Sequence, residues 1–335
     1  MRFAQLLLVL GGLLASLGLQ SGIAAAAADK PLEDPKVRAF IEEVALRHKL
    51  ERSKLEALFS EAQFTQKVLD AFSRPAESKP WHVYRKIFLT RSRIDGGARF
   101  WQANEAILRA AQAKFGVPPE IITAIIGVET NYGRHKGRLR VLDALTTLAF
   151  RYPRRAKFFR GELEAFLLLV GEEGLPAQSL KGSYAGAVGF PQFIPSSYRA
   201  YAVDFDGDGR RDLLGSLPDA IGSVANYLKR HRWRAGKPVA LRVTGVARDD
   251  PRLARRSLKP KLEARALSDT GVVSASNPLA PGKVVLFALE GGKGSEYWIG
   301  YRNFYAITRY NPSRLYAMAV YQLSLAIQEA HAKLD

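Results

Sequence analysis

The sequence predicts an α+β fold that is mainly helical and carries a small β subdomain. Apolar residues recur at helical spacing through most of residues 35–230 and again near the C-terminal end. The segments 239–243, 284–289 and 297–307 instead alternate in polarity or are β-branched and aromatic, which is typical of strands. A charged and then Pro/Ser/Gly-rich stretch, 247–281, lies between the first two of these strands.

Local signals set the first helix boundaries. Asp34 and Pro35 are typical of a helix start, and the spacing of Ser53 and Glu56 is that of a capping box at the start of a second helix. Residues 74–80 are predicted to form a linker. A longer helix is predicted over 98–115, where Gly116 ends it.

Two adjacent prolines, Pro118 and Pro119, start the next helix, whose residues 120–129 are apolar nearly all round. Such a helix is expected to be buried. Further helices are predicted over 141–150, 153–170 and 218–230, a Gly-rich loop over 182–195, and a last amphipathic helix that Ser313 caps.

The N-terminal residues resemble a secretory signal: Arg2, an apolar run over 6–19, and small residues over 24–28. We therefore expect a cleaved signal peptide (1–28) and a soluble periplasmic protein without a transmembrane anchor after cleavage. The chain has no cysteine for a disulfide or for lipid attachment. Its net charge of +18 favours a polyanionic partner, and the export signal argues against nucleic acid. Cell-wall polymers fit that compartment.

Glu129 is the main candidate for chemistry. It ends the apolar helix, where loss of solvent and the helix dipole should both raise the pKa of its carboxyl group. A carboxyl group with a raised pKa serves glycosidases as the general acid. The alternative is a structural glutamate that pairs with Arg134 or Arg138.

Five blocks resemble the lytic murein transglycosylase B family: PPEIITAIIGVETNYGR (118–134), LDALTTLAFRYPRR (142–155), GSYAGAVGFPQFIPSSY (182–198), DAIGSVANY (219–227) and YWIGYRNFYAITRYN (297–311). The resemblance covers about Val37 to Ile327 and implies a goose-lysozyme-like core. It also implies cleavage of the β-1,4 bond between N-acetylmuramic acid (MurNAc) and N-acetylglucosamine (GlcNAc) in peptidoglycan glycan strands, leaving 1,6-anhydro-MurNAc ends. Glu129 would be the single acid/base, and catalysis would need no cofactor.

The resemblance also implies a set of substrate-binding residues. Ser183 and Gln192 would hydrogen-bond the sugar at the cleavage point, and Arg154 and Arg155 would meet peptide or lactyl carboxylates. Four tyrosines would line the glycan groove: Tyr84, Tyr227, Tyr305 and Tyr310. Other cell-wall enzymes are additional candidate partners.

The segment DFDGDGRRD (204–212) has the spacing of an EF-hand calcium loop. Oxygen ligands are predicted from Asp204, Asp206, Asp208, the Arg210 carbonyl and Asp212. Position 12 of the loop is Gly215; the family resemblance implies a last ligand somewhat later, for which Asp219 is the match, with one extra residue in the loop. The ion would be a structural calcium or sodium. The alternative is an Asp/Gly-rich turn that binds no metal.

The expected organisation after the signal peptide is an N-terminal helical segment (29–78), a lysozyme-like catalytic core (79–235), a small β subdomain (236–295) and a C-terminal strand and helix that complete the core (296–335). Two other functions remain open at this point. One is a hydrolytic muramidase of the same fold, and the other is a non-catalytic peptidoglycan-binding scaffold.

Overall fold

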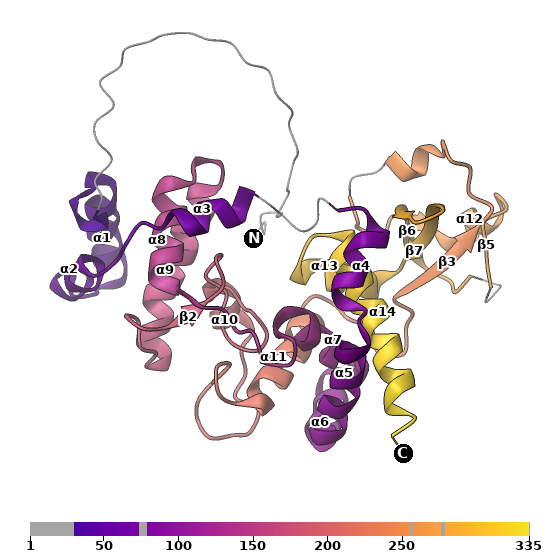
Figure 1. The fold of residues 1–335 in the computed structure, drawn as a ribbon, viewed down its shortest axis with the longest axis horizontal. Coiled ribbons are helices and arrows are strands. Elements are labelled where there is room, and N and C mark those ends of the chain that lie inside the picture. The colour runs from indigo at the N-terminus through magenta and orange to yellow at the C-terminus, as the bar shows by residue number, and fades with distance from the viewer. Residues whose placement is uncertain (1–29, 74–78, 255–256, 276–278, 335) are drawn as a thin grey trace, which may run out of the picture. The chain divides into compact units, whose positions relative to one another are not determined.

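The computed structural model describes residues 30–73, 79–254, 257–275 and 279–334. The predicted signal peptide and most of the predicted linker at 74–80 lie outside these residues. Contacts divide the chain into two compact units. Unit 1 comprises the residues up to Ser73, Gly137–Val188 and Ile194–Arg199, and unit 2 comprises Arg74–Lys136, Gly189–Phe193 and Ala200–Asp335. Figure 1 labels the elements of both. Among the described residues, no helix is long and apolar enough to span a membrane.

Unit 1 is helical apart from one short strand pair. Its elements are a 3-10 turn (Pro31–Glu33), α1 (Pro35–His48), α2 (Arg52–Ser60), α3 (Gln66–Ser73), β1 (Leu139–Arg140), α8 (Val141–Arg151), a 3-10 turn (Pro153–Arg155), α9 (Ala156–Glu173) and β2 (Lys181–Gly182). The helices α8 and α9 pack along each other, and β1 pairs antiparallel with β2. The short helix α10 (Pro195–Tyr201) begins in this unit.

The helical part of unit 2 surrounds one buried helix. Its elements are α4 (Trp81–Phe88), α5 (Arg91–Ala103), α6 (Glu105–Phe115), α7 (Pro119–Thr130), α11 (Leu217–Arg230), α13 (Arg302–Tyr310) and α14 (Arg314–His331). The C-terminal helix α14 packs against α4, α5 and α7, and α11 packs against α6 and α7 (Figure 1). The predicted burial of the apolar helix is confirmed, because α7 is covered from several sides.

The β subdomain of unit 2 is a five-stranded antiparallel sheet with the order β4-β6-β7-β3-β5. Its elements are β3 (Ala240–Thr244), a 3-10 turn (Pro251–Ala254), β4 (Leu262–Glu263), α12 (Ala264–Ser268), β5 (Val273–Ser274), β6 (Lys283–Gly291) and β7 (Gly294–Gly300). The strands β6 and β7 form a hairpin closed at the Gly291–Gly294 pair. Apolar side chains that include Val284, Leu286 and Ile299 form a separate small core.

Most predicted helix ends are confirmed. The carboxylate of Asp34 accepts a hydrogen bond from the Lys36 N–H at 2.8 Å, and Ser313 caps α14 through the Tyr316 N–H. Gly116 ends α6 in the left-handed conformation, with φ of 73°. The predicted capping box is wrong, because Glu51 is the N-cap of α2 and the Ser53 hydroxyl donates to the Glu51 carboxylate instead.

Two predicted elements are divided in the structure. The single helix predicted over 98–115 breaks at Asn104, whose amide donates to the Phe100 carbonyl at 2.8 Å and competes with the backbone ladder. The strand predicted over 297–307 ends at Gly300, and α13 follows at once. A β-carbon on Gly300 would lie 2.6 Å from the Phe304 ring, so this glycine allows the helix to fold back onto the strand. Tertiary packing therefore overrides the β propensity of that segment.

Candidate active site

Glu129 lies in the last turn of α7 and is partly exposed, although the residues around it in this helix are buried. These buried residues are 121–128 and Thr130. The Tyr316 hydroxyl of α14 donates a hydrogen bond of 2.5 Å to Oε1 of Glu129. Burial, reinforced by the negative charge of Glu129, raises the pKa of Tyr316 well above its usual value. Tyr316 therefore stays protonated at neutral pH and donates a hydrogen bond to this carboxylate.

The backbone that follows Glu129 is held by several side chains. The Thr130 hydroxyl donates to the carbonyls of Ile126 and Phe190 and accepts the N–H of Gly133. One step earlier, Nη1 of Arg93 donates to the Gly127 carbonyl at 2.7 Å. The last carbonyls of a helix lack intrahelical partners, and Arg93 provides a donor to one of them, that of Gly127. The last turn of α7, which carries Glu129, is thus fixed from the side of α5 and from the loop at 189–193.

Two predicted tyrosines belong to an aromatic cluster beside this turn. The Tyr310 and Tyr316 rings are stacked with centroids 6.4 Å apart, and Tyr227 lies 4.7 Å from Tyr310. The Tyr310 hydroxyl donates to the Pro191 carbonyl, and the Tyr227 hydroxyl donates to the Arg309 carbonyl. Burial raises the pKa of both hydroxyls, so they stay protonated at neutral pH. The cluster gives the surroundings of Glu129 low polarity and fixed donors.

Gln192 is the other predicted residue beside this turn. Its Nε2 donates to the carbonyls of Lys136 and Gly189, at 3.2 and 3.0 Å. Its backbone has φ of 51°, the left-handed region that few residues other than glycine adopt. Such strain is frequent at functional positions, where the surrounding contacts hold it in place.

Two more predicted tyrosines of unit 2 differ in exposure. Tyr84 on α4 is only 2% exposed and packs against Trp81 and Phe88. Tyr305 on α13 is partly exposed, with the guanidinium groups of Arg302 and Arg309 at 5.3 and 6.0 Å from its ring centroid. Tyr305 therefore offers more of its ring to a ligand than Tyr84 does.

The three remaining predicted substrate residues belong to unit 1. Ser183 forms a tight turn in which its hydroxyl accepts the N–H groups of Ala185 and Ala187. Arg154 is exposed, and Arg155 is half-buried with its guanidinium 4.2 Å from the Phe158 ring centroid. The Ser183 hydroxyl accepts in both of these bonds, so its proton can be donated to a ligand, and the guanidinium N–H groups of Arg154 face solvent.

Glu162 is a buried carboxylate in unit 1 that is not among the residues predicted from the sequence. It accepts the Ser196 hydroxyl at 2.7 Å and the Ser196 N–H at 3.0 Å, and so anchors the start of α10. Burial raises its pKa, although these hydrogen bonds and the nearby Arg155 act in the opposite direction. Its position within an apolar helix, α9, was the available sequence signal.

The predicted metal loop brings three of its carboxylates together. Oxygens of Asp204, Asp206 and Asp219 lie within 4.8 Å of one another. Asp219 is fully buried, and burial raises its pKa despite hydrogen bonds from the N–H groups of Phe205 and Asp212. No described basic side chain forms an ion pair with these three residues. A buried carboxylate among others without a counter-charge fits a hard cation.

The other predicted ligands of the loop bond to its backbone. Asp208 accepts the N–H of Arg210 at 2.8 Å, and Asp212 accepts the N–H groups of Leu214 and Gly215. These bonds use one oxygen of each carboxylate. Neither residue joins the three-carboxylate group. The predicted six-ligand set is therefore supported most directly at Asp204, Asp206 and Asp219.

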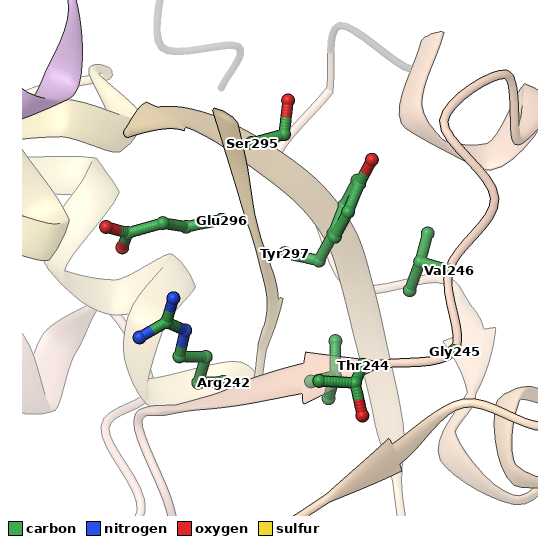
Figure 2. A pocket seen from close by; sticks show the side chains of 8 residues that line it. Arg242, Thr244, Gly245, Val246, Ser295, Glu296 and Tyr297 are labelled. Atoms are coloured by element: carbon green, nitrogen blue, oxygen red, sulfur yellow. The ribbon is translucent and has the colours of Figure 1, made fainter. Parts of the chain in front are cut away.

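A separate hollow of about 280 Å³ lies in the β subdomain, where β3 leaves β7 and continues beside β5 (Figure 2). Figure 2 shows Arg242 and Glu296 on one side of the strands and Tyr297 and Val246 on the other. The carboxylate of Glu296 already lies 3.6 Å from the Arg85 guanidinium. The hollow contains none of the predicted site residues.

The fold and the Glu129 site define a lysozyme-like transglycosylase. The family model "Transglycosylase SLT domain" matches residues 33–325. The chain therefore belongs to the transglycosylase SLT family, and it is a lytic transglycosylase that acts on peptidoglycan. It is 43% identical over 311 residues to the membrane-bound lytic murein transglycosylase B of Escherichia coli, covering 90% of this chain and 84% of the relative.

Solved structures agree with this assignment. The soluble lytic transglycosylase SltB1 from Pseudomonas aeruginosa matches with a TM-score of 0.83 and 46% identity, covering 89% of this chain and 100% of that one. The structure of Escherichia coli Slt35 in complex with calcium matches with a TM-score of 0.82 and 42% identity, covering 92% of this chain and 96% of that one. The structure of Pseudomonas aeruginosa SltB3 in complex with NAG-anhNAM-pentapeptide matches with a TM-score of 0.77 and 33% identity, covering 89% of this chain and 79% of that one.

Proposed function

We propose that Glu129 is the single general acid/base of a reaction that cleaves the β-1,4 MurNAc–GlcNAc bond and forms 1,6-anhydro-MurNAc ends. The observation that carries this proposal is the partly exposed carboxylate in the last turn of buried α7, oriented by the Tyr316 hydroxyl. The complex of SltB3 with a NAG-anhNAM-pentapeptide supports the same product.

The proposed reaction needs one enzymic carboxyl group because the substrate supplies the nucleophile. Protonated Glu129 donates its proton to the glycosidic oxygen as the C1–O bond breaks, which releases GlcNAc with a free hydroxyl group. The C6 hydroxyl of the same MurNAc then bonds to C1, and the Glu129 carboxylate accepts its proton. The enzyme returns to its starting protonation state, and no water is consumed. The 2-acetamido group of the substrate can stabilise C1 between these steps.

The surroundings of Glu129 suit this role. The Tyr316 hydroxyl, which burial keeps protonated, donates a hydrogen bond to one oxygen of the carboxyl group, and the partial exposure of Glu129 lets a substrate reach that group. The residues proposed to bind the sugar are Ser183, Gln192, Tyr84, Tyr227, Tyr305 and Tyr310, and those proposed to meet substrate carboxylates are Arg154 and Arg155.

Glu129→Gln is the direct test, because an amide keeps the shape of the side chain but cannot exchange the proton. We expect formation of anhydro-muropeptides from purified sacculi to fall by at least about a thousandfold, in line with the loss of an essential acid/base. The matched control is Glu120→Gln on the same helix, which should keep wild-type activity. Mass spectrometry distinguishes the products: reducing MurNAc ends from the wild type would indicate a muramidase, and binding without products would indicate a scaffold.

We also propose that Asp204, Asp206 and Asp219 hold a structural calcium ion, with Asp208, the Arg210 carbonyl and Asp212 completing its ligands. The Slt35 structure in complex with calcium supports this choice of ion. The metal takes no part in the proton transfers. Its effect would be to neutralise the converging carboxylates and so to fix the loop before α11.

The proposed location is the periplasm, after removal of residues 1–28. The absence of cysteine from the whole sequence supports a soluble protein, since lipid attachment at an N-terminal cysteine is excluded. The boundaries predicted at 29–78, 79–235, 236–295 and 296–335 remain the proposed organisation by function. Other cell-wall enzymes remain candidate partners.

A further inference from the structure

Five arginines of unit 2 lie near one another at the end of α11, in the segment that follows it and on α13. They are Arg230, Arg232, Arg234, Arg302 and Arg309, and we refer to them as the arginine cluster. Asn303 joins the two segments: it is fully buried, its Oδ1 accepts the Arg234 N–H, and its Nδ2 donates to the carbonyls of Arg234 and Lys237, each at 2.8 Å. The nearness of these arginines is therefore fixed by the fold.

The cluster has no counter-charge in the described part of the chain. None of its five guanidinium groups forms an ion pair with a described carboxylate, whereas exposed arginines elsewhere in unit 2, such as Arg91 and Arg109, do. The charges also act on one another: burial first, and then the charge of Arg232, lower the pKa of Arg302. Like charges held together without a partner reduce stability, which favours an external anion as the partner.

Two arginines of the cluster lie beside one of the proposed sugar-binding rings. Arg302 and Arg309 approach the Tyr305 ring from α13, and the carbonyl of Arg309 accepts the Tyr227 hydroxyl. An anion that reaches these arginines while a sugar contacts Tyr305 has to be attached close to that sugar. The peptide stems of peptidoglycan meet this requirement, because each stem is linked to a MurNAc residue and carries free carboxylates.

We propose that the arginine cluster binds the carboxylates of a peptide stem next to the sugar at Tyr305, so that the enzyme prefers glycan strands that still carry their stems. This rests on the proposed function. The cluster is distinct from Arg154 and Arg155, which belong to unit 1. Multiple guanidinium groups bind carboxylates through paired N–H donors, and such binding weakens as salt increases.

The test uses the full chain and the double variant Arg232→Gln with Arg234→Gln, which leaves Arg302 and Arg309 in place beside the Tyr305 ring. Arg232 has φ of 68°, and glutamine keeps its β-carbon, so backbone strain there is unchanged. The substrates are purified glycan strands with stems and the same strands after an amidase has removed the stems. For strands with stems we expect KM of the variant to rise about tenfold, equivalent to two partly exposed ion pairs, and kcat to stay unchanged. For bare strands KM should match the wild type.

Controls separate this proposal from its alternatives. Arg91→Gln with Arg109→Gln removes the same charge from α5 and α6 and should leave KM unchanged on both substrates. The cluster variant should melt at or above the wild-type temperature, because repulsion is relieved. An equal rise of KM on bare strands, or no rise on either, overturns the proposal. The proposal is also overturned if the wild type has the same KM on strands with and without stems but is inhibited by polyphosphate. That result would show that the cluster binds a phosphate polymer. Absence of anhydro products from wild type on either substrate contradicts the proposed function instead.

Discussion

At the residue scale, the chemistry depends on one hydrogen bond between groups 187 residues apart in the chain. The Tyr316 hydroxyl limits the orientations that the Glu129 carboxylate can adopt, and it supports the charged form by donating to it. The two stacked rings of Tyr310 and Tyr316 fix this donor in turn. Tyr316 is therefore proposed as a positioning residue for Glu129.

Tyr316→Phe tests this role, because only the hydroxyl group is removed. We expect kcat for anhydro-product formation to fall about tenfold or more, the usual consequence of losing a hydrogen bond to a charged group, while KM changes little. The carboxylate should also be protonated more readily, which moves the alkaline limb of the pH–rate profile, where the general acid loses its proton, to higher pH. Tyr321→Phe on the same helix is the matched control. If Tyr316→Phe raises only KM, or leaves the pH profile unchanged, Tyr316 has a purely structural role.

At the element scale, the loop before α11 combines two tasks. Its glycines, Gly207 and Gly209, have φ of 80° and 87° and let the backbone wrap around the Asp204 carboxylate, which accepts both of their N–H groups. The loop then leads into α11, where Asp219 is buried in the first turn and Ser216 is the cap. Asp219 therefore links the conformation of this loop to the start of α11.

Calcium should raise the melting temperature by about 4 °C at a concentration a hundred times its Kd, because it binds the folded state alone. Differential scanning calorimetry with calcium and with a chelator measures this shift. The shift should vanish in Asp206→Asn and persist in the control Asp249→Asn, which changes an exposed aspartate of the β subdomain. A calcium shift that Asp206→Asn leaves intact would place the ion elsewhere.

At the scale of the whole molecule, the net charge is +18, and the basic side chains differ in whether a carboxylate lies beside them. Several arginines of unit 1 have carboxylate partners, as in Arg140–Asp143, Arg151–Asp34 and Arg199–Glu172. The arginine cluster of unit 2 has none among the described residues. Stability and pH dependence should therefore be sensitive to the cluster and to the histidine within it.

His231 connects this cluster to the pH dependence of stability. Burial, together with the charges of Arg309, Arg302 and Arg230, lowers its pKa from 6.5 to about 4. Between these values the unfolded chain binds a proton that the folded protein does not, so stability falls as the pH decreases from about 6.5 to about 4. The loss is no more than about 3 kcal/mol, and less to the extent that solvent screens the site.

His231→Gln removes this titration. In thermal melts from pH 7 to pH 4, the wild type should lose more stability than His231→Gln, whereas the exposed-site control His135→Gln should follow the wild type. Carboxylates also titrate between pH 7 and pH 4, but they contribute equally to both proteins. The difference in stability between wild type and His231→Gln therefore cancels their contribution. Parallel melting curves for wild type and His231→Gln would show that His231 is protonated equally in both states.

The fold class, the buried helix that carries Glu129 in its last turn, and most helix caps could be predicted from the amino-acid sequence. These features depend on local periodicity and on residues such as Asp34, Ser313 and Gly116, whose backbone preferences act within one turn. The repeated Asp and Gly residues of the 204–212 loop were readable for the same reason.

The remaining features depend on contacts between elements that are distant in the sequence. The pairing of Tyr316 with Glu129, the anchoring of Ser196 by Glu162, and the contact of Asn303 with Arg234 join residues distant in sequence, which periodicity cannot predict. The same holds for the change from strand to helix after Gly300, where packing of Phe304 outweighs local propensity. Local rules decide whether a segment can form an element, but long-range contacts decide which side chains meet, because burial and hydrogen bonding are satisfied between elements.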